Sequence, residues 1–178
     1  MALRNILTED YPELHKKCRP VDNFAARTHQ LLDDMIETLK SADGVGLAAP
    51  QVGILRRAAI VLETNVPEGE EEYFIELLNP EIVSVEGEQT GPEGCLSVPG
   101  IFGLVTRPNR VRVRAQDRNG EWFEVEGEGL TARAFCHEVE HLDGHVFREK
   151  VIRYLSDEEM RGDDGEAEEE PEEDEEQA

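Results

Sequence analysis

The stretch HEVEHLDGH, residues 137–145, constrains the fold more than any other part of the chain. Residues four apart face the same side of an α-helix, so a helix here would bring the imidazoles of His137 and His141 to one ion. Glu138 lies one residue on, about 100° further round the helix, where it could take a proton from a water beside that ion. The pattern therefore predicts a metal-binding helix that pairs a Lewis acid with a general base.

The residues by themselves leave the third protein ligand open. One arrangement places a further His three residues after the glycine that follows the motif, but Phe147 stands there. Another uses a glutamate from a later helix, and Glu158 or Glu159 lies at a suitable distance downstream. A third candidate is Cys95, in the irregular stretch GPEGCLSVPG. Three protein ligands with a fourth position open are typical of a catalytic site rather than a structural one.

Elsewhere, apolar periodicity predicts a helix near each end of the body and strands between them. Residues 24–40 place apolar side chains on one helical face, with Asp22 or Asn23 as the cap. The segment at 57–64 predicts a buried strand, and 74–88 predicts two extended pieces joined at Asn79-Pro80. Alternation around Asn119-Gly120 predicts a hairpin.

The second helix is expected at residues 131–142, with Thr131 as its N-cap and Gly144 just past its end. We therefore expect an α+β fold, in which antiparallel β-sheets pack around a central metal-binding helix, with an N-terminal helix. Cys18 and Cys136 are interpreted as buried core residues.

The loop GVGLAAPQVG, residues 44–53, resembles a dinucleotide fingerprint but lacks its context. That fingerprint follows a strand and opens a helix. Here it follows a predicted helix, and Pro50 interrupts any helix that Gly46 would open. Gly44 and Gly46 instead allow close approach of the backbone to a ligand, which suits main-chain pairing with an extended peptide.

The charge is concentrated at one end of the chain. Residues 157–178 hold 14 acidic residues and a single Arg161, so they carry 13 of the 23 net negative charges. We expect one domain over residues 1–156 and an acidic, disordered tail over 157–178. Such a charge argues against nucleic-acid binding. There is no apolar run long enough for a membrane span, and three widely spaced cysteines favour a reducing cytoplasm.

Three stretches in the same order resemble the peptide deformylase family: GVGLAAPQVG, EGCLS at 93–97 and HEVEHLDG at 137–144. With the strands between them, the resemblance covers nearly all of residues 1–155. It implies a bacterial cytoplasmic enzyme that removes the N-formyl group from the initiator methionine of nascent polypeptides and releases formate. It also implies one divalent ion, Fe²⁺ in the cell with Zn²⁺, Ni²⁺ or Co²⁺ as alternatives, held by Cys95, His137 and His141.

The same resemblance implies roles for further residues. The amide of Gln51 and the backbone N–H of Leu96 would stabilise the formyl oxygen, and Glu138 would be the general base. The substrate methionine would be bound by Val45, Gly46, Leu130 and Ala134. An ion pair of Glu93 with Arg107 would brace the loop of Cys95. The chain departs from many bacterial relatives at Phe102, where they carry an arginine.

Two other function classes remain open from the residues. A zinc endopeptidase that uses Glu158 or Glu159 would keep its metal after Cys95→Ser and would cut casein. In a metal-binding or partner-binding module without catalysis, Glu138→Gln would change no measurable property. Some deformylases end in a helix that docks on the ribosome, so we expect transient ribosome proximity, although rRNA phosphate would repel so acidic a tail.

Truncation after Leu155 tests the interpretation of the tail. We expect turnover of a small formyl-peptide to stay unchanged, because the family resemblance assigns no site residue to the removed segment. Steady-state kinetics of the full-length and shortened proteins would measure this. A large loss of turnover would contradict it.

Overall fold

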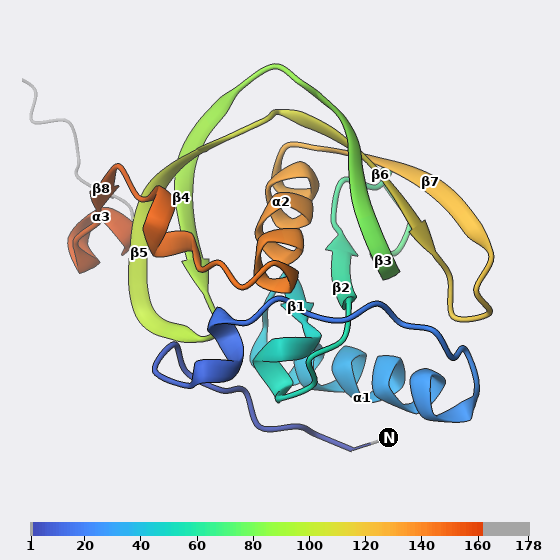
Figure 1. Cartoon of the computed structure of the whole chain (residues 1–178). Helices are drawn as coiled ribbons and strands as arrows, with labels where there is room; N and C mark the ends of the chain where they lie inside the picture. The colour runs from blue at the N-terminus through green and yellow to red at the C-terminus, as the bar shows by residue number, and fades with distance from the viewer. Residues whose placement is uncertain (1, 162–178) are drawn as a thin grey trace, which may run out of the picture.

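The computed structural model describes residues 2–161 (Figure 1). The helices are α1 (Ala26–Ala42), α2 (Leu130–Leu142) and α3 (Asp157–Arg161), with 3-10 turns η1 (Pro12–His15), η2 (Ala49–Val52) and η3 (Phe147–Lys150). The strands are β1 (Gly46–Ala48), β2 (Ala58–Glu63), β3 (Tyr73–Glu86), β4 (Gln89–Cys95), β5 (Val98–Arg107), β6 (Arg110–Gln116), β7 (Trp122–Glu128) and β8 (Arg153–Tyr154).

The strands form two antiparallel sheets with α2 between them (Figure 1). One sheet has the order β1-β2-β3-β6-β7, and the other has the order β4-β5-β8. The short connection from β3 to β4 arches over α2 and carries the chain from the first sheet to the second (Figure 1). The α+β class with antiparallel sheets and a central helix is thus confirmed.

Helix α2 is buried around most of its circumference, because sheets cover it on two sides. Phe135 and Leu142 of this helix are fully buried in the hydrophobic core of the protein, and Cys136 is buried as expected. The predicted N-cap is wrong: the helix begins at Leu130, and the hydroxyl of Thr131 donates to the buried carboxylate of Glu63 at 2.7 Å. The Thr131 hydroxyl thus binds a residue that is distant in the sequence instead of capping its own helix.

The end of α2 agrees with the sequence. Gly144 has a φ of 84° and donates its N–H to the carbonyl of His141. A Cβ at Gly144 would lie 2.9 Å from the backbone carbon of His15, so the site requires glycine for space as well as for its conformation.

Helix α1 buries the predicted face, since Leu32, Met35 and Leu39 are inaccessible to solvent. Its predicted cap is wrong: the N-cap is Ala25, and Asn23 lies two residues earlier, where its side chain accepts the N–H of Ala25 at 2.9 Å. The helix packs against β1 and β2 (Figure 1). Arg27, Gln30 and Lys40 on its other side are exposed to solvent.

Strand β3 is continuous, where the sequence predicted two pieces joined at Asn79-Pro80. The irregularity sits where expected, because the register with β6 shifts between Leu78 and Glu81. Asn79 has a φ of 50° there, a conformation that asparagine tolerates better than most residues. Its side chain accepts the N–H of Val21 at 2.7 Å and donates to the carbonyl of Val21 and to Gln116.

The predicted strand at 57–64 corresponds to β2, and the predicted hairpin at Asn119-Gly120 joins β6 to β7. Residues 157–161 form the exposed helix α3, so the expectation of disorder is wrong for this part. The remainder of the predicted tail, 162–178, lies outside the described residues. Within residues 2–161, no helix has the length and apolarity that a membrane crossing requires.

Replacing Asn79 tests the bulge. We expect Asn79→Ala to lower the free energy of unfolding by about 2–3 kcal/mol, because three hydrogen bonds are lost and alanine disfavours this φ. Asn79→Gly loses the same three hydrogen bonds but should lower the stability less, because glycine adopts this φ without strain. Urea denaturation measures both variants. The exposed Asn65→Ala is the control, and equal stability of Asn79→Ala and Asn65→Ala would refute the role of the bulge.

Candidate metal centre

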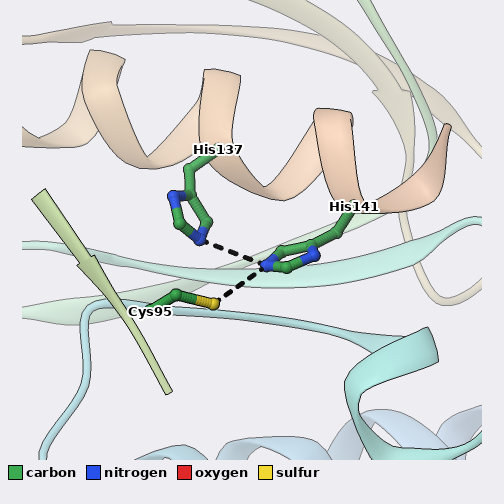
Figure 2. Close-up of side chains that lie close together, drawn as sticks. All are labelled: Cys95, His137 and His141. Carbon is green, nitrogen blue, oxygen red and sulfur yellow. Dashed lines mark hydrogen bonds between the residues drawn. The ribbon is translucent and has the colours of Figure 1, made fainter. Parts of the chain in front are cut away.

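The side chains of Cys95, His137 and His141 point toward one another beside α2 (Figure 2). Their donor atoms all lie within 4.8 Å of one another. The Nε2 atom of His141 lies 3.3 Å from Sγ of Cys95 and 3.1 Å from Nε2 of His137. The histidines come from successive turns of α2, and the thiol comes from the end of β4. The residues that the sequence named as ligands therefore converge from two distant segments.

Cys95 reaches this position because β4 loses its register at that point. Gly94 pairs with Phe102, but Cys95 pairs with Val98, so β5 carries three extra residues at the turn. This irregularity turns the thiol inward toward α2 (Figure 2). Glu158 and Glu159 lie on the exposed α3, where Glu159 pairs with Arg153, and neither belongs to the cluster.

The cluster fits a divalent metal ion. Bonds of about 2.0–2.3 Å to one ion bring nitrogen and sulfur ligands to within about 4 Å of each other, close to the separations found here. The Nδ1 atom of His137 contacts the carboxylate of Glu93 at 2.7 Å, so its Nε2 is directed into the cluster. Imidazole and thiolate donors suit iron, zinc, nickel or cobalt, and they do not suit magnesium or calcium.

The charges of the two imidazoles agree with this fit. Burial, together with the nearby His137, lowers the pKa of His141 well below its ordinary value, which leaves a neutral ring with a free lone pair. Burial also disfavours charge at His137, but contacts with Cys95 and Glu93 outweigh it and raise the pKa of His137. The centre therefore favours one positive charge near His137, which a cation would provide.

Glu93 lies behind His137 and connects it to the rest of the fold. It is buried and accepts hydrogen bonds from Arg107, at 2.6 and 3.1 Å, and from Arg133 at 2.8 Å. Burial would raise the pKa of Glu93, but the hydrogen bonds of His137 and Arg107 hold it far below its ordinary value. The ion pair of Glu93 with Arg107 is thus present, and Arg107 also pairs with Glu140 at 2.7 Å.

Glu138 lies beside the cluster with an unsatisfied carboxylate. It is buried, and its Oε2 has no hydrogen-bond partner in the described part of the chain. Burial raises the pKa of Glu138 to about 7, which the charge of His137 offsets only in part. Gly46 packs directly against this side chain, and a Cβ at Gly46 would lie 2.8 Å from the Cδ of Glu138. The carboxylate is therefore fixed in place and free to exchange a proton.

Gln51 is held with its amide nitrogen toward Cys95. Its Oε1 accepts the N–H of Ala48 at 2.8 Å, while its Nε2 donates to the hydroxyl of Ser97 at 3.1 Å and lies 3.6 Å from Sγ of Cys95. The backbone N–H of Leu96 makes no hydrogen bond to any described residue. Two N–H donors, one from a side chain and one from the main chain, thus come from segments that adjoin the thiol.

A pocket of about 440 Å³ opens onto this centre. Its lining includes all the predicted substrate-contact residues, namely Val45, Gly46, Leu130 and Ala134, together with Gln51, Leu96, Cys95, His137 and Glu138. His141 lies deeper and is not part of the lining. The site residues that the sequence predicted are thus gathered around one pocket.

Two residues of the site were missed from the sequence. Ser97 fixes the orientation of the Gln51 amide, and Arg133 binds Glu93 and lines the pocket. Ser97 gives no signal of its own, because a serine after a turn is ordinary. Arg133 could have been found, because it stands four residues before His137 and so lies on the same face of the helix.

A helix with two clustered histidines, a thiol from a separate strand and a buried free carboxylate beside a pocket are features of one class of protein, the metal-dependent hydrolases. The sequence model of polypeptide deformylases matches residues 3–156. The chain therefore belongs to the polypeptide deformylase family.

Individual relatives agree with that assignment. The chain is 53% identical to a peptide deformylase of Caldicellulosiruptor bescii, over 90% of this chain and 92% of the relative. A crystal structure of a peptide deformylase from Legionella pneumophila is 42% identical, with a TM-score of 0.76 over 88% of both chains. An Acinetobacter baumannii peptide deformylase with Met-Ala-Ser bound is 34% identical, with a TM-score of 0.78 over 84% of this chain and 99% of that one.

Removing Glu93 tests its place behind the ligands. We expect Glu93→Ala to lower the free energy of unfolding of the metal-free protein by about 3–5 kcal/mol, because Arg107 and Arg133 lose a buried counter-charge. Urea denaturation gives the value. The matched control is Glu126→Ala, whose exposed ion pairs should contribute less than about 1 kcal/mol. Similar stabilities for the two variants would show that Glu93 does not hold the centre together.

Proposed function

We propose that this protein removes the N-formyl group from the initiator methionine of nascent polypeptides and releases formate. The observation that carries the proposal is the meeting of Cys95, His137 and His141 beside the buried free carboxylate of Glu138, in a member of this family. The catalytic domain spans residues 1–156, and the acidic segment 157–178 takes no part in the chemistry.

Cys95, His137 and His141 would hold one divalent ion, which when bound supplies a Lewis acid that lowers the pKa of water and stabilises developing negative charge. Fe²⁺ is our choice for the cell, with Zn²⁺, Ni²⁺ or Co²⁺ able to replace it. The sulfur ligand supports this group of four metals, because soft sulfur donors favour them over harder ions.

Glu138 acts as the general base and then as the general acid. Its unpartnered Oε2 takes a proton from the attacking water and returns it to the nitrogen of the leaving amine, which frees the methionyl N-terminus. Gly46 supports this role, because its lack of a side chain lets the carboxylate pack where it does.

The formyl oxygen becomes negative as water attacks, and two donors meet it. They are Nε2 of Gln51 and the backbone N–H of Leu96, both next to Cys95. One preorganised donor of this kind typically contributes about 3 kcal/mol to the barrier reduction. Ser97 and Ala48 hold the Gln51 amide in place, so little reorganisation is needed during the reaction.

The methionine side chain occupies the apolar part of the pocket formed by Val45, Leu130 and Ala134. The peptide backbone pairs with the main chain at Gly46, at the free edge of β1. Main-chain pairing does not depend on side-chain identity, which suits an enzyme whose substrates are many different nascent chains. The Met-Ala-Ser peptide bound to the Acinetobacter baumannii relative supports this substrate class.

Because the proposed substrates are nascent chains, we expect the enzyme in the bacterial cytoplasm and close to ribosomes while it acts on them. The net charge of −23 supports a contact with the peptide alone, without specific binding to nucleic acid and without a membrane.

Glu138→Gln and Cys95→Ser together test the proposal. We expect Glu138→Gln to keep its metal and to lose hydrolysis of formyl-Met-Ala-Ser by about a thousandfold or more, since the general base is gone. Cys95→Ser should lose the metal as well, because a neutral hydroxyl replaces the thiolate. Elemental analysis of anaerobically purified protein and coupled detection of formate measure the two effects.

The controls are Glu126→Gln on the exposed face of β7 and Cys18→Ala in the core, both expected to retain metal and activity. Casein cleavage, with metal retained in Cys95→Ser, would support an endopeptidase instead. Unchanged behaviour of Glu138→Gln would support a binding module without catalysis.

A further inference from the structure

A segment with no part in the chemistry described above contacts the main chain behind the oxyanion donor. Residues 2–9, which we call the strap, precede η1 and belong to none of the helices or strands (dark blue in Figure 1). The N–H of Leu7 donates to the carbonyl of Gln51 at 2.7 Å, and the N–H of Glu9 donates to the carbonyl of Ser97 at 2.9 Å. The strap thus holds both Gln51 and the residue that orients its amide.

These two bonds join parts of the fold that the main chain does not otherwise connect. Gln51 lies on η2, and Ser97 lies in the turn between β4 and β5. Within residues 2–161, no main-chain hydrogen bond runs directly from η2 to that turn. The amide of Gln51 is oriented by its side-chain bond to Ser97 at 3.1 Å, so its position depends on the distance between the two backbones. The strap sets that distance from outside the pocket.

The strap is anchored on both sides of these contacts. On one side, the guanidinium of Arg4 binds the buried carboxylate of Asp34 on α1 at 2.9 and 3.1 Å. On the other side, both carboxylate oxygens of Glu9 bind the guanidinium of Arg148 on η3 at 2.7–2.9 Å. Leu7 lies between the two anchors, so releasing either anchor would let the two bonded carbonyls shift.

The outer anchor, the ion pair of Glu9 with Arg148, is well ordered but only partly buried. Its side chains are 32% and 31% exposed, and an ion pair so open to solvent contributes little to global stability. Its forked geometry nevertheless fixes a direction, because both oxygens of the carboxylate are engaged. The Nε2 atom of His15 lies 2.7 Å from the carbonyl of Glu9 and holds the same residue from η1. This anchor therefore fixes a position more than it stabilises the fold.

We propose that the strap positions the oxyanion donor, and that Glu9 and Arg148 are positioning residues for the amide of Gln51. The inference rests on the proposed function and adds to it a device outside the pocket. The amide meets negative charge that develops only as water attacks, so its displacement weakens the transition state and leaves substrate binding almost unchanged. A misplacement of roughly 1 Å can lower a rate by about a hundredfold.

The first experiment removes the outer anchor in the metal-loaded full chain and measures hydrolysis of formyl-Met-Ala-Ser. We expect Glu9→Ala to lower kcat by about tenfold, to change KM by less than about twofold and to retain the metal. Arg148→Ala removes the same ion pair from the other side and should give the same result.

The matched control is Asp33→Ala, which breaks an ion pair with Arg118 of similar exposure, 36% and 33%, on α1. This variant should keep the wild-type kcat. Urea denaturation should show equally small losses of stability in Glu9→Ala and Asp33→Ala, because both lose one exposed ion pair.

A double-mutant cycle separates positioning from a general structural effect. Gln51→Ala alone should lower kcat by about a hundredfold or more, because the donor itself is gone. Since Glu9 acts through Gln51, adding Glu9→Ala to Gln51→Ala should lower kcat by less than about twofold further.

Four results would overturn the inference while the proposed function stands. They are a wild-type kcat in Glu9→Ala, a loss confined to KM, release of the metal, and a loss that multiplies with that of Gln51→Ala. Failure of the wild type to hydrolyse any formyl-peptide would instead overturn the proposed function.

Discussion

The buried carboxylate of Glu93 is the interaction on which the centre depends. It joins β4 to β5 through Arg107 and to α2 through Arg133 and His137. Two cations and an imidazole around one anion hold the three-stranded sheet and the helix in one arrangement. A buried charge is tolerated only when it is paired and hydrogen-bonded, so each of these partners stabilises the positions of the others.

This arrangement explains how the same residues serve both stability and function. The contact of Glu93 with Nδ1 of His137 turns Nε2 of that ring toward Cys95. Arg107 also forms an ion pair with Glu140, the residue directly before His141 on α2. The orientation of the imidazoles is thus set by residues outside the cluster of Cys95, His137 and His141, as is common in metal sites.

The pocket is shaped as much by the lack of side chains as by their presence. Gly46 leaves room for the carboxylate of Glu138, and Gly94 leaves room for the ring of Phe102. Both glycines have φ values that any residue could adopt, so space is the reason for glycine at these two positions. In the proposed function, the space at Gly46 therefore lets the proton carrier Glu138 take its position.

The sequence by itself determined what depends on neighbours along the chain. The four-residue spacing of His137 and His141, the stop at Gly144 and the turn at Asn119-Gly120 follow from local geometry, and each appears as predicted. Tertiary structure decided what depends on distant partners. Thr131 bonds to Glu63 instead of capping its helix, and Ser97 binds Gln51.

The third member of the cluster shows the difference most plainly. From the residues alone, Cys95 competed with Glu158 and Glu159, and only a family resemblance separated them. The choice depends on the path of the chain between β4 and α2, because Cys95 and His137 are 42 positions apart and no local pattern encodes that path. The bulge after Gly94 turns the thiol inward, and the buried charge of Glu93 joins β4 to α2, two segments that are far apart in the sequence.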